Sequence, residues 1–143
     1  MVVSLAFWLF LGGALTVGWL AGDRRDRPIL IAIGLAAMGT QTTQATLDSA
    51  TWRFVLVAID LALLCFVSQQ ALSSARHWPM WFAGFHAMTL LCNFIALFLS
   101  GPGQMAMFML GAFWSLPALA ALIIGVLRDR RAGLAPATSQ RPA

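Results

Sequence analysis

Asp60 is the residue whose type and position point most directly to chemistry. It is the single charged residue in the apolar run 54–72, and a run of that length can cross a bilayer as a helix. An ionisable side chain inside a membrane is costly, so it is expected to face other protein groups or water and never lipid. We therefore predict that Asp60 lies among polar partners from neighbouring helices.

Polar residues in two other apolar runs are expected at the depth of Asp60. Their order along antiparallel helices places Gln41, Asp60 and Asn93 on one level, with Gln44 just above. On the run 79–99, the i, i+3, i+7 spacing puts three polar residues on one helix face. The candidate polar layer comprises Gln41, Gln44, Asp60, His86, Thr89 and Asn93. Two interpretations stay open: a pocket or proton-accepting site reached from outside, or a hydrogen-bonded clasp that fixes helix packing.

The remaining residues give no catalytic or cofactor pattern. A bis-histidine haem needs two imidazoles that face each other, and His77 lies too close to His86 in the sequence for that. No grouping suits zinc, and no Gly-rich loop suits phosphate. Cys65 and Cys92 lie in apolar runs and are predicted to pack as small apolar side chains. We therefore predict no catalytic residue, no metal, no cofactor and a non-enzymatic protein.

The elements that must position this layer are membrane-spanning helices. Of the 143 residues, 60% are hydrophobic and only 10% are charged, whereas soluble domains are about one-quarter charged. Five runs are candidates for spans, at residues 2–21, 28–47, 54–72, 79–99 and 105–127. The fold class predicted is an all-α integral membrane protein, a five-helix transmembrane bundle over residues 1–131. Residues 132–143 are predicted to be a disordered cytoplasmic tail, because they have little apolar surface to bury.

The second run is the least certain span because it turns polar near its end, and the arginines decide the matter. With five spans, only Arg53 lies outside, and eight arginines fall on the cytoplasmic side. These are Arg24, Arg25, Arg27, Arg76, Arg128, Arg130, Arg131 and Arg141. Without the second span the division is four against five, which is no bias. The positive-inside rule thus favours five spans, an N-terminus outside and a C-terminus inside.

Two series of small residues mark candidate helix-packing faces. Ala14, Gly18 and Gly22 recur at four-residue spacing in the first run, and Gly111 and Ser115 do so in the fifth. Such series let helix backbones approach closely in membranes. The sequence leaves open whether these faces pack inside one chain or against a partner.

Three sequence features carry a resemblance to a known group of proteins. They are Asp60-Leu61 in an apolar helix, the segment RHWPMWFAGF at residues 76–85, and Trp114-Ser115. From roughly residue 27 to residue 131 the chain resembles a group of small multi-pass membrane proteins of alphaproteobacteria, of the sphingomonad type. The resemblance implies a bacterial inner membrane and brings no assigned activity. Where that group is expected to have Gln, this chain has His86.

Two functional hypotheses follow. The first is a small accessory or scaffold subunit that packs in the lipid bilayer against a larger membrane protein or against itself. The alternative is a small transporter, channel or ligand-binding protein that uses the layer around Asp60. A cavity that reaches Asp60 would favour the alternative, and a sealed, fully bonded Asp60 would favour the scaffold. Nucleic acid is not an expected partner, because the arginines cluster at helix ends.

Overall fold

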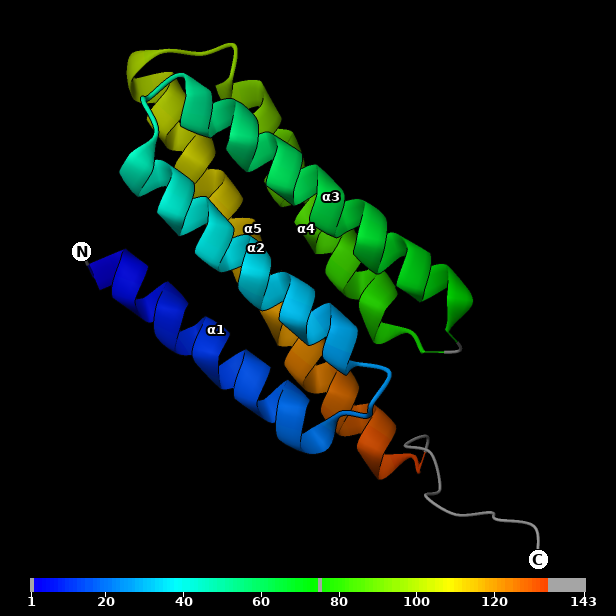
Figure 1. The fold of residues 1–143 in the computed structure, drawn as a ribbon. Helices are drawn as coiled ribbons and strands as arrows, with labels where there is room; N and C mark the ends of the chain where they lie inside the picture. Colours follow the sequence, from blue (N-terminus) through cyan, green and yellow to red (C-terminus); the bar gives the residue numbers. More distant parts are fainter. Residues whose placement is uncertain (1, 75, 134–143) are drawn as a thin grey trace, which may run out of the picture.

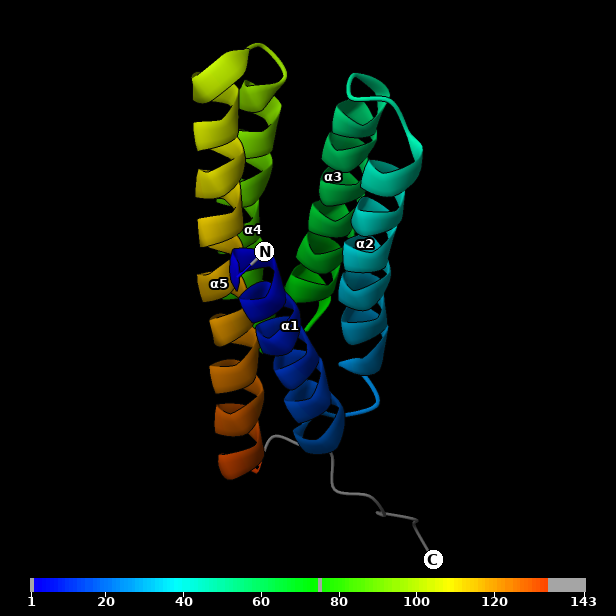
Figure 2. The same ribbon diagram turned by 90° about the vertical axis from the view of Figure 1, so that its left-hand side faces the viewer.

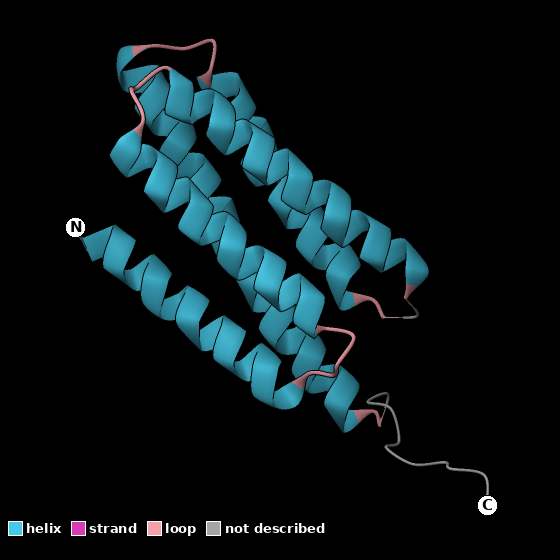
Figure 3. Cartoon of the chain, viewed as in Figure 1, coloured by secondary structure: helices cyan, strands magenta, loops and turns pink. Residues whose placement is uncertain are grey.

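The computed structural model describes residues 2–74 and 76–133, and these residues form five helices joined by short loops (Figures 1 and 3). The helices are α1 (Val2–Ala21), α2 (Arg27–Thr46), α3 (Thr51–Ser73), α4 (Trp78–Ala96) and α5 (Gly101–Arg131). The described residues contain no strand. The described part of the chain is therefore all-helical, as the apolar runs predict. The predicted disordered tail falls, from residue 134 onward, outside the described residues.

The helix bounds differ from the predicted spans mainly around α4 and α5. The predicted spans 79–99 and 105–127 leave residues 100–104 between them, whereas α4 ends at Ala96 and α5 already begins at Gly101. Gly101 takes a φ of +62°, a left-handed conformation that glycine tolerates, and so turns the chain into α5. Pro102 then occupies the first turn, where its missing N–H is no loss. α5 also continues to Arg131, since hydropathy marks the apolar part of a helix and not its ends.

The five helices form a ring that follows the order of the chain. Each helix packs on the next, and α1 closes the ring by packing on both α2 and α5. Figure 2 shows the pair α2–α3 diverging from the pair α4–α5 towards their loops, while α1 crosses between the pairs further down. We call the loop end at residues 47–50 and 97–100 the wide end. The narrow end comprises the loops at residues 22–26 and 74–77 and the last turn of α5.

Three helices are long and apolar enough to cross a membrane, namely α3, α4 and α5. In α1, the segment Phe7–Ala21 is also apolar but is shorter than these three helices. Large apolar side chains also face outward, as at Leu72, Phe98 and Ile124, which are 86%, 75% and 64% exposed. These helices are consistent with a membrane protein, because a lipid environment would cover that outer surface.

The hydrophobic core fills the narrow half of the ring. Leu122, Val67 and Val126 are almost fully buried there, together with Trp78. Gly125 allows this packing, because a Cβ at that position would overlap the Trp78 side chain. The wide half lacks such filling, and the diverging helices leave space for a cavity.

Candidate functional site

A cavity of about 720 Å³ lies between the helix pairs and reaches from the wide end to the middle of the bundle. All five helices contribute to its wall. Its volume falls in the range of small-molecule sites, about 300–1,000 Å³. Towards the wide end the wall includes Trp52 of α3 and Phe108 of α5, whose ring centroids are 5.3 Å apart. The cavity therefore has aromatic groups near the wide end and becomes polar further in.

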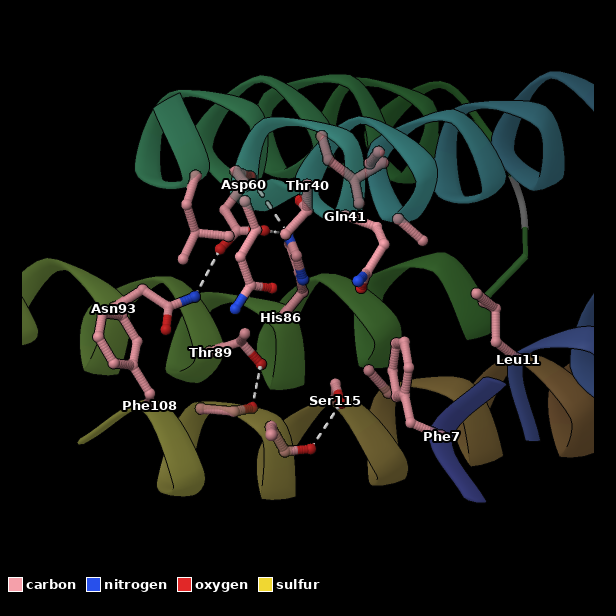
Figure 4. A pocket seen from close by; sticks show the side chains of 18 of the residues that line it. Phe7, Leu11, Thr40, Gln41, Asp60, His86, Thr89, Asn93, Phe108 and Ser115 are labelled. Carbon is pink, nitrogen blue, oxygen red and sulfur yellow. Dashed lines mark hydrogen bonds and ion pairs between the residues drawn. The ribbon is translucent and has the colours of Figure 1, made fainter. Parts of the chain in front are cut away.

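The structure brings the whole candidate polar layer to this one cavity. Gln41, Gln44, Asp60, His86, Thr89 and Asn93 all line it. Figure 4 shows Gln41 reaching from α2 into the space that Asp60 and Asn93 border from α3 and α4. Asp60 lies nine residues after the start of α3, which is about 13 Å along the helix axis. The polar residues thus form a layer across the middle of the cavity, and the wall on the narrow-end side of this layer is apolar.

Asp60 is held by two residues of α4. Its Oδ2 accepts a hydrogen bond from Asn93 Nδ2 at 2.7 Å. His86 Nε2 lies 3.1 Å from the backbone oxygen of Asp60. Because a carbonyl oxygen can only accept, His86 donates through Nε2. The ring of His86 also stacks on Phe82, with centroids 5.8 Å apart. These contacts fix the Asp60 carboxyl group and link α3 to α4.

Asp60 is nevertheless not fully bonded. Its Oδ1 lies 3.9 Å from His86 Nε2, which is beyond hydrogen-bond distance. The side chain keeps 10% of its surface exposed, and the residue lines the cavity. Thr89 Oγ1 donates to the Gly111 carbonyl at 3.2 Å, so the lone pairs of that hydroxyl stay free. The polar part of the wall therefore offers several acceptor atoms to a bound molecule.

Gly111 is required for this arrangement of α4 against α5. A Cβ at Gly111 would lie 2.9 Å from Asn93 Oδ1 and 3.5 Å from Cys92 Cβ. The missing side chain lets α5 approach the part of α4 that carries Asn93. Ser115, one turn further along α5, lines the cavity and donates to the Ala112 carbonyl at 2.6 Å. This small-residue series therefore packs inside the chain and shapes the site.

The small-residue series of α1 also packs inside the chain. Ala14 is fully buried. A Cβ at Gly18 would lie 2.6 Å from a methyl carbon of Leu30, and Gly22 lies against the Asp26 side chain. Both candidate packing faces are thus occupied by other helices or loops of the same molecule.

No protein-family model, curated protein or solved structure matches this chain. The resemblance noted from the sequence stays a prediction.

The sequence interpretation missed several residues that shape the cavity. Thr40 and Gln104 are polar lining residues, and Trp52 and Phe108 are aromatic ones. Gln104 also donates to the Ala96 and Leu99 carbonyls, both at 2.9 Å, and so caps the end of α4. Thr40 directly precedes Gln41, a predicted member of the polar layer. That position was the one sequence signal for Thr40 as a residue of the same site. The aromatic pair could not be found from spacing, because it joins α3 to α5.

A second polar cluster, also missed, closes the narrow end. Arg76 hydrogen-bonds Asp23 and Asp26 of the α1–α2 loop, and its Nε lies 3.9 Å from Asp129 Oδ2 near the end of α5. Asp26 is only 2% exposed and also accepts the Asp23 backbone N–H at 2.8 Å. We call Asp23, Asp26, Arg76 and Asp129 the narrow-end cluster. It ties three separate chain segments together opposite the cavity mouth.

Proposed function

We propose that this chain is a multi-pass membrane protein that binds a small molecule in the cavity between its helices. The observation that carries the proposal is the cavity of about 720 Å³ that reaches Asp60 and is crossed by a layer of polar groups. A membrane carboxyl group that borders a cavity is typical of a ligand or ion pathway. A packing clasp alone would leave no reason for such a space, because ordinary interiors are close-packed.

We propose further that all five helices cross the inner membrane. In the ring, α2 runs beside α3 and carries no charge over residues 28–47. Seven of the eight arginines assigned to the cytoplasm lie at or near the narrow end, whereas Arg53 is near the wide end; Arg141 is outside the described residues. This distribution supports a cytoplasmic narrow end and a wide end that faces the periplasm. The resemblance to alphaproteobacterial membrane proteins supports the same compartment.

Cysteine labelling tests this topology. Single cysteines are introduced into a variant without Cys65 and Cys92, and intact cells are treated with a membrane-impermeant maleimide. Cysteines at Ser49 and Gly103 should be labelled, and a cysteine at Ser74 should react only after the cells are opened. Labelling at Ser74 in intact cells would contradict both the second span and the orientation.

A blocked cavity tests ligand binding. Ala112 lines the cavity on α5, and Ala106 is an exposed residue of the same helix that does not line it. The wild-type chain in nanodiscs should bind a neutral phenylalkane probe, (5,5-dimethylhexyl)benzene. Equilibrium binding is measured by saturation-transfer NMR. Ala112→Trp should abolish saturable binding, and Ala106→Trp should retain it. Equal binding by both variants, or none by the wild type, would refute the proposal.

The accessory-subunit hypothesis stays a second proposal, with a different expected result. It predicts that a larger membrane protein co-purifies with the chain in mild detergent. The glycines of both small-residue series lie against other parts of the same chain, so these series give that hypothesis little support. A stoichiometric partner, retained by Ala112→Trp, would favour the accessory role over ligand binding.

A further inference from the structure

The wall of the cavity indicates the charge of its ligand. Asp60 is the single residue with a formal charge among those that line it, and no arginine or lysine lines it. The nearest basic residue along α3 is Arg53, whose Nε donates to the Ser49 carbonyl in the wide-end loop. Seven residues separate it from Asp60, which is about 10 Å along the axis. A bound molecule therefore meets a carboxyl group whose one neighbouring basic side chain among the described residues is the His86 imidazole, with Nε2 3.9 Å from Asp60 Oδ1.

The polar groups in contact with Asp60 leave several acceptor atoms free, while the side-chain amides of Gln41 and Gln44 offer donors as well. Asp60 Oδ1 has no hydrogen-bond partner among the described residues. Asn93 uses Nδ2 to donate to Asp60, which leaves its Oδ1 as an acceptor. An anionic ligand group would find no arginine or lysine here. A cationic group would find a carboxylate and several oxygen lone pairs.

Five aromatic side chains contribute to the remaining wall, alongside a larger number of aliphatic ones. Phe7 and Trp8 come from α1, Trp52 from α3, Phe82 from α4 and Phe108 from α5. The faces of aromatic rings attract organic cations. Aromatic walls around one carboxyl group suit a cation with an apolar body better than a hydrated metal ion.

We infer that the cavity binds an amphipathic organic cation, with its positive group at Asp60 and its apolar part against the aromatic wall. This inference rests on the proposed ligand-binding function and adds the class of ligand. The Asp60 carboxylate supplies the counter-charge, and Asn93 and His86 hold it in position. No covalent step is involved.

The test compares two probes of nearly equal shape. Phenylbutyl-trimethylammonium carries a positive charge that does not depend on pH. The neutral probe, (5,5-dimethylhexyl)benzene, has a tert-butyl group in place of the trimethylammonium group. Binding is measured by equilibrium dialysis of each probe against the chain in nanodiscs of zwitterionic lipid. Empty nanodiscs serve as the blank. The wild-type chain should bind the cation about tenfold or more tightly than the neutral probe.

Asp60→Asn should remove this preference while it keeps the affinity for the neutral probe, which also shows that the cavity has folded. Asp48→Asn removes an equal charge in the wide-end loop, outside the cavity, and should keep the preference. Trp52→Leu should weaken binding of the cation more than binding of the neutral probe.

Three results would overturn the inference, and they can be distinguished. If the wild type binds both probes equally, the ligand class is wrong but ligand binding stands. If it binds neither probe, the proposed function fails as well. A preference that survives Asp60→Asn and disappears in Asp48→Asn would refute the role of Asp60.

Discussion

Removal of Arg76 should destabilise the bundle more than removal of any exposed arginine. Arg76→Gln leaves the carboxyl groups of Asp23, Asp26 and Asp129 near one another without their shared cation. Burial lowers the pKa of Arg76, but hydrogen bonds and charges from Asp26 and Asp23 more than offset that effect and raise it. Arg76 is therefore charged at every pH at which the protein would be studied, and its loss is felt throughout that range.

The magnitude can be bounded from burial. Removal of one partner from a fully buried ion pair costs about 3–5 kcal/mol, whereas an exposed pair contributes about 0.2–1 kcal/mol. Asp26 is 2% exposed, but the side chains of Arg76 and Asp23 each keep 13% of their surface exposed. The cluster thus lies between the two limits, and we expect a loss of about 2–3 kcal/mol in the free energy of unfolding.

The assay is reversible unfolding in mixed detergent micelles, titrated with SDS and followed by tryptophan fluorescence. A double-mutant cycle with Asp26→Asn should give a coupling energy above about 1 kcal/mol, because the two residues are in contact. The corresponding cycle with Asp129→Asn should give less, since that carboxyl oxygen lies 3.9 Å from Arg76 Nε. Arg24→Gln, at an exposed position of the same α1–α2 loop, is the control and should change stability by less than about 0.5 kcal/mol.

One result would refute this reasoning. If Arg76→Gln unfolds within about 0.5 kcal/mol of the wild type, as surface substitutions do, the narrow-end cluster does not hold the loops together. The closure of that end would then depend on the hydrophobic core alone.

Two further predictions concern packing and titration. Gly18→Leu should destabilise the chain by about 1–3 kcal/mol through overpacking, because even a Cβ there would lie 2.6 Å from a methyl carbon of α2. The control is Gly12→Leu, which should be tolerated because the space around Gly12 is open. Both variants are measured by the same SDS titration. The pKa of Asp48 should be found below its ordinary value by carboxyl NMR, because side-chain and backbone hydrogen bonds of Thr51 favour the charged form. A lowered folded-state pKa stabilises the fold above the ordinary value, and this contribution is lost as the pH falls through the lowered one; an ordinary or raised pKa would contradict the expectation.

The helices could be predicted because each is encoded locally. Apolar runs of about 20 residues predict helices that satisfy their own backbone hydrogen bonds, and all five runs correspond to helices in the structure. The exact ends could not be predicted from hydropathy. Gly101 begins α5 by adopting a positive φ, and Gln104 then caps α4. Both effects depend on local geometry and not on apolar content.

The members of the polar layer could also be proposed from the sequence. Depth along antiparallel helices grouped Gln41, Asp60 and Asn93, and helical spacing placed His86 on the face of Asn93. These relations use only the 1.5 Å rise and the order of the helices. They do not specify how far apart the helix axes lie, so they left a sealed clasp and an open pocket equally compatible with the same residues.

Only the tertiary structure shows that the same residues link α3 to α4 and also border a cavity. The divergence of α2–α3 from α4–α5 sets the width of the wide end and leaves the cavity beside Asp60. At the other end, Arg76 meets acids about 50 residues away on either side in sequence, and nothing in its local sequence identifies them as partners. A local pattern sets which face of a helix is polar, but the angle between helices results from the sum of many side-chain contacts along their lengths. The sequence by itself therefore determined the helices and the residues of the polar layer, and the packing of the ring determined that they line a cavity.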